Sequence, residues 1–346
     1  MTAPPQVYVI QGQTERDWRD CQAALAHVPA RMTALPYIGD PDALIARTRD
    51  ADALVVAFSP ITRAVMSALE GLKTVVRTGV GYDVIDVPAA TELGVIVVNI
   101  PDIWIREVAN HALALLLAWN RKVVTLDRQV HAGVWTGSVP GDRTGALHGE
   151  TVGIVGLGNI GSAFARRVAA LDTTVIACDP YVEPARFAAL GVERVSLETL
   201  AERSDYVSVH TLLNDETRHL IGEKFFQRMK PTAILINTSR GPVVDETALA
   251  RALQDKRLAG AALDVWEQEP VAADHPLLAM DNVIATPHAA YFSTAAVAAV
   301  PRRCGEEVAR VLTGQRPLNV VNAQVYAPGA ARRSDMKRDV KRDVKR

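Results

Sequence analysis

Three glycines spaced G-x-G-x-x-G are the first feature of this sequence that suggests chemistry: Gly156, Gly158 and Gly161. An apolar run ends just before them, and a helical pattern begins near Ile160. The first glycine then permits a tight turn, the second lets the backbone approach a pyrophosphate, and the third lets the helix pack on the strand. N–H groups at a helix start, here at Asn159 and Ile160, favour an anion. The pattern predicts a dinucleotide site.

An acidic residue, Asp179, ends the next strand candidate, eighteen residues past Gly161. A carboxylate at this position accepts hydrogen bonds from both hydroxyls of an adenosine ribose and repels a 2′-phosphate. The spacing therefore favours NAD over NADP. The alternative role for Asp179 is to cap a turn, because Asp-Pro pairs commonly start one.

Arg240, Glu269 and His288 follow three further strand candidates. An open α/β sheet binds its ligands at the carboxyl ends of its strands. An arginine can hold a carboxylate and polarise a carbonyl group, and a histidine can supply a proton near neutral pH. This set of side chains suits the reduction of a 2-keto acid by hydride transfer.

Short apolar runs, each fit for a buried strand, alternate with helix-length segments along most of the chain. Such alternation indicates parallel sheets covered on both faces, so we expect an α/β protein with two doubly wound domains. The ten strand candidates are 7–10, 53–57, 74–77, 95–98, 152–155, 174–177, 206–209, 233–236, 260–263 and 282–285.

The series restarts after a long apolar helix expected at 107–124, which indicates an inserted domain. We expect a first domain at 1–102 and 294–325, interrupted by a dinucleotide-binding domain at 103–293, with helix 295–312 returning the chain to the first domain. The tail 326–346 carries eight basic and three acidic side chains. Its composition predicts a disordered basic terminus, with an electrostatic tether as the alternative.

The bulk composition excludes several classes of function. A formal net charge of −1 gives no reason to expect nucleic acid or a membrane surface as a partner. Three cysteines without CxxC spacing argue against a disulfide framework, and no cluster has metal-ligand spacing, so we expect no metal. The first residues lack an export signal, and no apolar run approaches the length of a membrane span. A cytoplasmic protein is expected.

With these motifs in view, the sequence resembles the D-isomer-specific 2-hydroxyacid dehydrogenases over residues 5–323. Besides the glycine turn and Asp179, the resemblance rests on GVGYD at 79–83, EVANH at 107–111, TSRG at 238–241, DVWEQEP at 264–270 and PH at 287–288. The resemblance implies a flavodoxin-like substrate domain with an inserted Rossmann domain that binds NAD.

The resemblance also implies roles for individual residues. Arg240, Glu269 and His288 would form the catalytic triad, with His288 as the proton donor and with Arg240 and His288 touching the substrate. Further contacts are implied for five residues: Asp264 with the nicotinamide carboxamide, Thr238 and His210 with the cofactor, and Val80 and Gly81 through backbone N–H groups with the substrate carboxylate. His111 and Trp119 are expected in the core of the long helix.

The leading hypothesis is an NAD-dependent D-2-hydroxyacid dehydrogenase acting on a small 2-keto or 2-hydroxy acid. An NAD(H)-sensing, corepressor-like binding protein and another hydride transfer, from formate or phosphite, are the alternatives. A homodimer is expected because the apolar face 112–119 and the loop 134–148 exceed what one domain needs to bury.

Trp104 and Arg106 depart from the family pattern. Arg106 is interpreted either as a reader of a second anionic group on the substrate or as an exposed residue beginning a helix.

Overall fold

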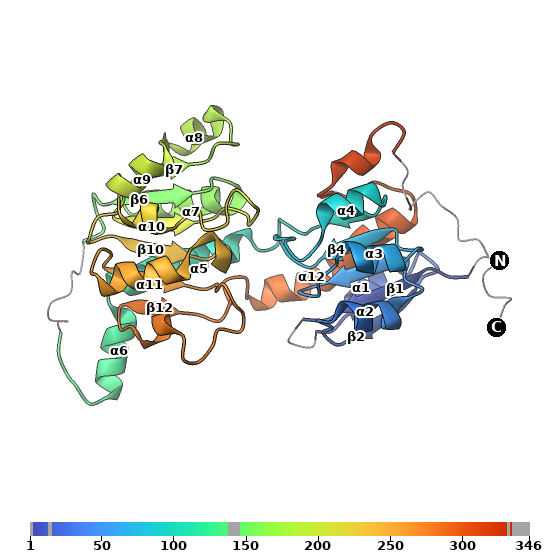
Figure 1. Cartoon of the computed structure of the whole chain (residues 1–346), viewed down its shortest axis with the longest axis horizontal. Helices are drawn as coiled ribbons and strands as arrows, with labels where there is room; N and C mark the ends of the chain where they lie inside the picture. Colours follow the sequence, from blue (N-terminus) through green and yellow to red (C-terminus); the bar gives the residue numbers. More distant parts are fainter. Residues whose placement is uncertain (1–2, 13–15, 138–145, 331–332, 334–346) are drawn as a thin grey trace. The chain divides into compact units, whose positions relative to one another are not determined.

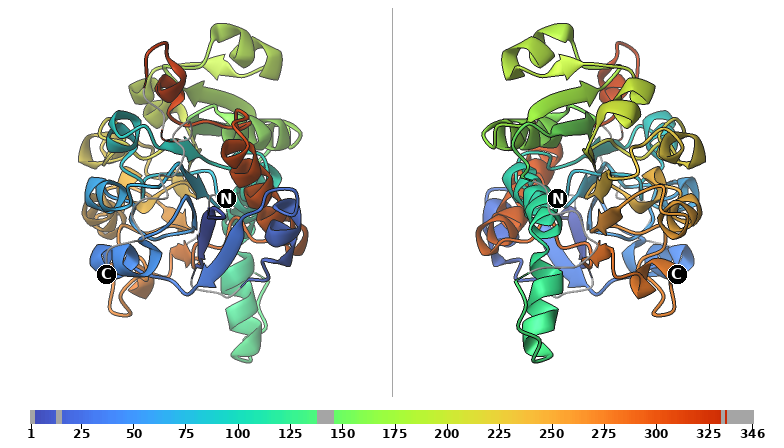
Figure 2. Two further views of the ribbon diagram at one scale, coloured as in Figure 1. Left: turned by 90° about the vertical axis from the view of Figure 1, so that its right-hand side faces the viewer. Right: turned by 90° about the vertical axis from the view of Figure 1, so that its left-hand side faces the viewer.

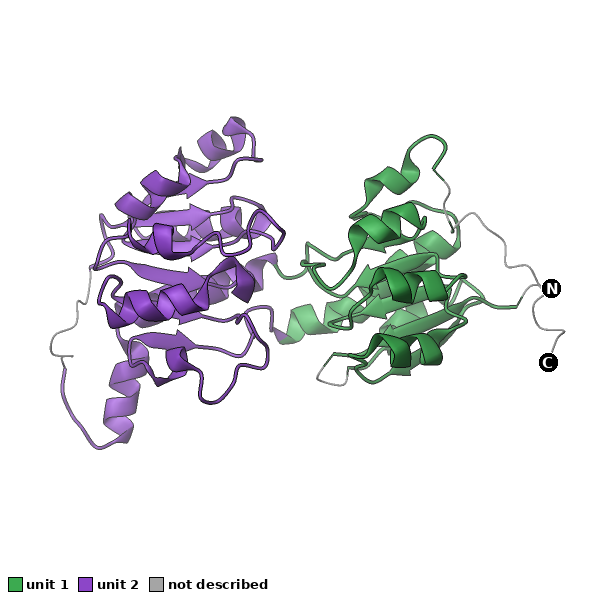
Figure 3. Cartoon of the chain, in the orientation of Figure 1, with its two compact units in different colours: residues 1–104, 294–346 green, residues 105–293 purple. Residues whose placement is uncertain are grey.

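The computed structural model describes residues 3–12, 16–137, 146–330 and 333. These fall into two compact units, unit 1 with residues 1–104 and 294–346 and unit 2 with residues 105–293 (Figure 3). The boundaries of these units fall after Trp104 and after Ser293, and the expected domain boundaries fall after residues 102 and 293. No helix among the described residues has both the length and the apolar composition to cross a bilayer.

Unit 1 contains a five-stranded parallel sheet in the order β2-β1-β3-β4-β5 (Figure 1). This order is the flavodoxin-like form of the doubly wound fold. Its strands are β1 (Gln6–Ile10), β2 (Arg31–Leu35), β3 (Ala53–Val56), β4 (Thr74–Arg77) and β5 (Ile96–Val98). Its helices are α1 (Arg19–Ala24), α2 (Pro41–Thr48), α3 (Arg63–Ala68), α4 (Val87–Glu92) and α12 (Thr294–Leu312), and η3 (Ala323–Tyr326) is a short 3₁₀ turn.

Unit 2 contains a seven-stranded parallel sheet in the order β12-β11-β10-β9-β6-β7-β8. The order extends the Rossmann arrangement by one strand beyond β11. Its strands are β6 (Thr151–Val155), β7 (Thr174–Cys178), β8 (Glu193–Arg194), β9 (Tyr206–Val209), β10 (Ile234–Asn237), β11 (Gly260–Leu263) and β12 (Val283–Ala285). Its helices are α5 (Ile105–Asn120), α6 (Val123–His131), α7 (Asn159–Ala169), α8 (Pro184–Leu190), α9 (Leu197–Arg203), α10 (Glu223–Phe226) and α11 (Glu246–Gln254), with 3₁₀ turns η1 (Gly241–Val243) and η2 (Pro276–Ala279).

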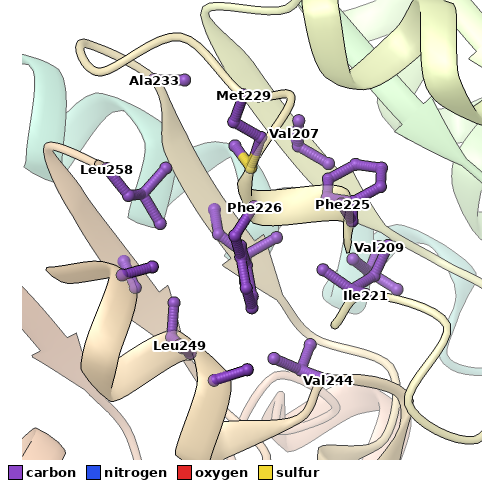
Figure 4. Close-up of a cluster of buried hydrophobic side chains, with 14 of the residues drawn as sticks. Val207, Val209, Ile221, Phe225, Phe226, Met229, Ala233, Val244, Leu249 and Leu258 are labelled. Carbon is purple, nitrogen blue, oxygen red and sulfur yellow. The ribbon is translucent and has the colours of Figure 1, made fainter. Parts of the chain in front are cut away.

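The two faces of this sheet are buried in two separate apolar cores. One core joins strand side chains such as Val207 and Leu235 to α9, α10 and α11, with Phe226 near its centre (Figure 4). The other joins alternate strand residues, such as Ile236, to α5, α7 and α8. Because successive strand side chains point to opposite faces, only continuous apolar runs can fill both cores. This explains why the central strands were predictable.

Several helices begin where a side chain satisfies their first free N–H groups. Caps of this kind start α2, α3, α4, α9 and α11, through Asp40, Thr62, Asp86, Ser196 and Asp245. A side-chain oxygen at this position accepts N–H bonds that the helix itself leaves unpaired.

Two strands were not predicted, β2 and β8. Both lie at a sheet edge with one neighbour each, and their sequences, RMTAL and ER, are not continuous apolar runs. No residue of either strand is fully buried, so neither strand requires a continuous apolar run. The single helix expected at 107–124 is two helices, because Lys122 adopts a left-handed backbone (φ 55°) between α5 and α6.

The expectation that the 112–119 face of α5 is left over for another subunit is wrong. Ala112, Leu115, Leu116 and Trp119 are buried within the core of unit 2 itself. Four of the exposed large apolar residues lie further along, on α6 and just after it: Val123, Val130, Val134 and Trp135. No residue of α6 is buried, and Figures 1 and 2 both show this helix extending beyond the body of unit 2.

The segment after α12 returns to unit 1, as expected, and covers the edge of β5. Val321 N–H donates to Val97 O at 2.9 Å. The side chain of Asn322, 1% exposed, accepts from Val97 N–H at 2.8 Å and donates to Val95 O at 2.9 Å. In the tail, Arg333 donates to Met66 O and Leu69 O. The other tail residues from 331 onward lie outside the described residues.

We predict that Asn322→Ala lowers the free energy of unfolding by about 2 kcal/mol or more, because it leaves a buried N–H and a buried C=O unpaired. Denaturant unfolding measures the change. Asn319→Ala is the matched control, because only the backbone carbonyl of Asn319 is bonded, to Asn99 N–H. If both variants lost an equal, small amount of unfolding free energy, a role for the Asn322 amide would be contradicted.

Candidate active site

The expected catalytic residues follow three adjacent strands of unit 2. β10, β11 and β12 are neighbours and pair in parallel, so their carboxyl ends lie at one edge of the sheet. Arg240 follows β10, Glu269 follows β11, and His288 follows β12. The topology therefore brings residues from three separate stretches of sequence to the same edge.

His288 and Glu269 are in direct contact. His288 Nδ1 lies 2.7 Å from Glu269 Oε2, and the backbone N–H of Trp266 donates to Glu269 Oε1 at 3.1 Å. The side chains are 24% and 31% exposed. The carboxylate therefore orients the imidazole while both remain reachable by a ligand, which is the arrangement of a histidine acid/base with its carboxylate partner.

Arg240 is half-buried in a loop that its neighbours hold closely. Asn237 Nδ2 donates to Arg240 O at 2.9 Å, and Asn237 Oδ1 accepts from the N–H and the hydroxyl of Ser239. A Cβ on Gly241 would lie 1.9 Å from the carbonyl carbon of Trp266. Only glycine permits this approach, which places the loop after β10 against the loop that carries Glu269.

The glycine turn has the geometry that its spacing predicts. Gly156 has φ 92°, a conformation that favours glycine. A Cβ on Gly161 would lie 2.1 Å from Gly156 O, whereas a Cβ on Gly158 would meet nothing within 4 Å. α7 begins at Asn159 without a side-chain cap. Because no side chain caps this helix, its first backbone N–H groups can bind an anion such as a phosphate.

Asp179 has the position expected of the ribose carboxylate and also the alternative role of a turn cap. Its Oδ1 accepts from Tyr181 N–H at 3.0 Å and from Val182 N–H at 3.2 Å. Its Oδ2 accepts from Leu157 N–H at 2.8 Å, inside the glycine turn. The carboxylate is thereby fixed beside the turn, and its contact with a ribose stays a prediction.

Two buried polar side-chain atoms have no hydrogen-bond partner among the described residues: His210 Nδ1, whose backbone lies next to Gly156, and Thr238 Oγ1, which follows β10. His210 Nε2 contacts Ser208 Oγ at 2.9 Å, and the ring packs on Phe164. Burial lowers the pKa of His210 to about 3, so its imidazole is neutral at physiological pH. A neutral, buried ring suits contact with a cofactor better than proton transfer. Buried polar atoms without a partner in the protein fit contact with a bound dinucleotide.

Asp264, expected to hold the nicotinamide carboxamide, is fully buried and bonded within the protein. Oδ1 accepts from Thr286 Oγ1 at 2.6 Å and from Ala289 N–H at 2.8 Å, and Oδ2 accepts from Ala290 N–H at 2.9 Å. The carboxylate therefore organises the loop around His288, and its contact with a carboxamide stays a prediction.

The expectation that His111 belongs to the core of the long helix is wrong, although Trp119 is a core residue. His111 Nε2 lies 3.2 Å from Thr286 Oγ1 and 3.4 Å from Asp264 Oδ1. Thr286 stands in a segment with polar groups at a strand end, but no role was predicted for it. The sequence offered one signal for such a contact. His111 stands on an otherwise apolar helix face, and a polar side chain buried there needs a hydrogen-bond partner.

Val80 and Gly81 follow β4 in unit 1. Asn99 Nδ2 donates to Val80 O at 2.7 Å, and Ile100 N–H donates to Gly79 O at 3.0 Å, so the peptide groups of this loop are held in place. The assignment of N–H groups to a substrate carboxylate stays a prediction.

Arg106 is the second residue of α5 and is exposed, and Trp104 is buried. A substrate contact of Arg106 also stays a prediction.

Residues 113–290 match the family described as D-isomer specific 2-hydroxyacid dehydrogenase, NAD binding domain. The chain belongs to this family. It is an oxidoreductase, a D-2-hydroxyacid dehydrogenase with an NAD-binding domain.

The chain is 44% identical to a glyoxylate reductase of Korarchaeum cryptofilum, over 82% of this chain and 86% of the relative. It is 40% identical to a D-3-phosphoglycerate dehydrogenase of Methanocaldococcus jannaschii, over 81% of this chain and 53% of the relative, so it spans about half of that protein. A solved NADPH-dependent glyoxylate/hydroxypyruvate reductase of Sinorhizobium meliloti, in complex with NADP and malonate, superposes with a TM-score of 0.83 at 29% identity, over 93% of this chain and 98% of that one. These relatives support the dehydrogenase hypothesis rather than the corepressor-like alternative.

Alanine substitutions at Gly158 and at Gly161 should affect this dehydrogenase in different ways, the first through NADH binding and the second through stability. We expect Gly158→Ala to keep the fold, because its Cβ has open space, and to weaken NADH binding by tenfold or more (about 1.4 kcal/mol), because the methyl group obstructs the pyrophosphate. We expect Gly161→Ala to lower the melting temperature, because its Cβ meets Gly156 O. NADH titration and thermal unfolding check both. A destabilised Gly158→Ala that still binds NADH normally would contradict this account.

Proposed function

We propose that this enzyme reduces glyoxylate or a similarly small 2-keto acid to the corresponding 2-hydroxy acid. The hydrogen bond of 2.7 Å between His288 Nδ1 and Glu269 Oε2 carries the proposal. With Nδ1 held by the carboxylate, Nε2 is the atom that gives a proton to the substrate oxygen. The names of the glyoxylate reductases among its relatives support a small substrate.

The roles of the side chains follow from the charges that the reaction develops. NADH, when bound, supplies a hydride to the carbonyl carbon of the substrate, and NAD⁺ and the hydroxy acid result. His288 delivers the proton that the new alkoxide oxygen needs, and Glu269 orients the ring and stabilises its charged form. Arg240 binds the substrate carboxylate and polarises the carbonyl group before the hydride arrives.

The proposed cofactor site is the glycine turn together with Asp179, Thr238 and His210. We propose NADH rather than NADPH as the working cofactor. A carboxylate held beside the turn repels a 2′-phosphate, and bonds from Leu157, Tyr181 and Val182 keep it there.

The test is NADH oxidation with glyoxylate, hydroxypyruvate and pyruvate, each repeated with NADPH. We expect saturable turnover with NADH and a lower kcat/KM with NADPH. His288→Ala should lower kcat/KM by roughly 10² to 10⁴, the range for loss of a general acid. Arg240→Ala should lower it by roughly 10² to 10³, the range for loss of one group that stabilises developing charge. Arg251→Ala and His27→Ala, both at exposed positions, are the matched controls.

Full activity in His288→Ala would contradict the assignment of the proton donor. Absence of turnover by the unmodified enzyme with all three keto acids would contradict the substrate class. A higher kcat/KM with NADPH would contradict the role of Asp179.

We also propose that two copies of the chain pair through α6. This helix has no buried residue, and its exposed apolar side chains include Val123 and Val130. Val134 follows it, and Trp135 after that is 91% exposed. A patch of this kind on a helix that unit 2 does not cover is typical of a surface buried by association. A second copy supplies a matching patch under two-fold symmetry.

Light scattering at micromolar concentration checks the dimer. We expect twice the chain mass for the unmodified protein and a shift toward monomer in Val130→Asp and Trp135→Glu, because each places a charge in the apolar contact. Arg128→Ala, at an exposed position on the same helix, should leave the mass unchanged. A monomeric unmodified protein would contradict the dimer.

We further propose that the enzyme works in the cytoplasm. Its three cysteines are free, two of them fully buried, and burial raises the pKa of Cys21 to about 12. Thiols without disulfide partners suit a reducing compartment.

A further inference from the structure

The backbone of His288 adopts an unusual conformation that something must maintain. Its φ is 51°, in the left-handed region that residues with a side chain rarely adopt. Three successive N–H groups of this loop point to one residue: His288 N–H donates to Asp264 O at 2.7 Å, Ala289 N–H to Oδ1 at 2.8 Å, and Ala290 N–H to Oδ2 at 2.9 Å. The N–H groups of Ala289 and Ala290 bind the Asp264 carboxylate, and with the left-handed residue His288 before them they form a nest, a turn of successive N–H groups that binds an anion. The carboxylate therefore stabilises the conformation that presents His288.

The nest needs a charged carboxylate, although Asp264 is fully buried. Burial would raise the pKa of Asp264, but hydrogen bonds from His111, Thr286, Ala289 and Ala290 outweigh it, and the pKa is lowered. Asp264 is therefore ionised at neutral pH. A buried charge is stable only when several donors compensate it, so each donor helps to maintain the loop.

One of these donors comes from a distant element, α5. Thr286 Oγ1 uses its proton in the bond to Asp264 Oδ1 at 2.6 Å, so its oxygen can only accept from His111 Nε2, 3.2 Å away. His111 Nε2 is also 3.4 Å from Asp264 Oδ1. The tautomer with hydrogen on Nε2 follows from this chain of donors.

α5 also contacts the 286–293 loop at the C-terminal end of that loop. Glu107, one turn before His111, accepts a hydrogen bond from Ser293 Oγ at 3.1 Å. The loop that carries His288 is therefore held at both ends, at Thr286 and at Ser293, by residues four apart on one helix face. A helix packed on the sheet is a rigid support for a loop in a strained conformation.

We propose that His111 is a positioning residue: through Thr286 and Asp264 it holds the 286–293 loop so that His288 is presented for proton transfer. This rests on the proposed function of His288 as the proton donor. His111 itself touches neither substrate nor cofactor in this role. Its loss should therefore change the rate of the chemical step more than the binding of either.

The experiment compares His111→Ala with His111→Gln, in which the amide Nε2 can replace the imidazole donor. Asn110→Ala, at the exposed neighbouring position on α5, is the matched control. We expect His111→Ala to lower kcat by roughly tenfold to a hundredfold, as for a misplaced catalytic group, with less than about a twofold change in KM for NADH. His111→Gln should recover most of the rate, and Asn110→Ala should retain it.

A second measurement does not depend on turnover. Hydrogen exchange in the NADH-free protein should be at least about tenfold faster at the Ala289 and Ala290 amides in His111→Ala, and unchanged in Asn110→Ala. Should His111→Ala not fold, Thr286→Val and Thr286→Ser replace it, because only serine keeps the hydroxyl that connects His111 to Asp264.

Unchanged kcat and unchanged exchange in His111→Ala, or in Thr286→Val, would overturn the proposal. A reduced kcat in His111→Gln equal to that of His111→Ala would also overturn it, because the donor would then not be the cause. If the unmodified enzyme reduces no keto acid, the proposed function fails, and the exchange rates alone decide whether His111 holds the loop.

Discussion

All neighbouring strands of the seven-stranded sheet run in the same direction, and this constraint determines where chemistry can occur. The carboxyl ends of parallel strands meet at one edge, so every loop that follows a strand begins there. β6, β7 and β9 contribute the glycine turn, Asp179 and His210. β10, β11 and β12, on the other side of β9, contribute Arg240, Glu269 and His288. The proposed cofactor-binding residues and the proposed catalytic residues thus lie on opposite sides of β9 along the same edge of the sheet.

Two carboxylates near this edge differ in burial, and the difference separates their roles. Glu269 is 31% exposed and contacts His288 directly, so its charge is available to a group that changes protonation during a reaction. Asp264 is fully buried and is surrounded by backbone N–H groups and by Thr286. A charge so compensated does not change during a reaction, and it stabilises structure instead. Glu269, which contacts His288, and Asp264, which binds the backbone of the loop that carries His288, therefore have different roles.

The shared fold does not by itself decide which dinucleotide a member of this family uses. The Sinorhizobium meliloti reductase superposes closely and was solved with NADP, whereas this chain has Asp179 where the adenosine ribose is expected. Fold similarity reports the layout of strands and helices, and cofactor choice depends on the charge of one or two side chains at the end of β7. Asp179 is also part of the local structure, since it accepts N–H bonds from Leu157, Tyr181 and Val182.

The limits of sequence-based prediction are clearest in unit 2. Central strands such as β9 and β10 were predictable because burial on both faces requires continuous apolar runs. The edge strand β8 was not, because a two-residue strand with one neighbour needs no such run. Along α5 the apolar face was recognised, yet it was assigned to another subunit. The sheet of the same unit in fact covers it.

The sequence by itself determined the order of the elements, the glycine turn and the residues that follow each strand, because these depend on local backbone requirements and on residue type. Only the tertiary structure decided which of those residues meet. His111 lies 175 positions before Thr286, and it reaches that hydroxyl because α5 packs across β10 and β11. No local pattern encodes such a contact, since it arises from the packing of a helix on a sheet.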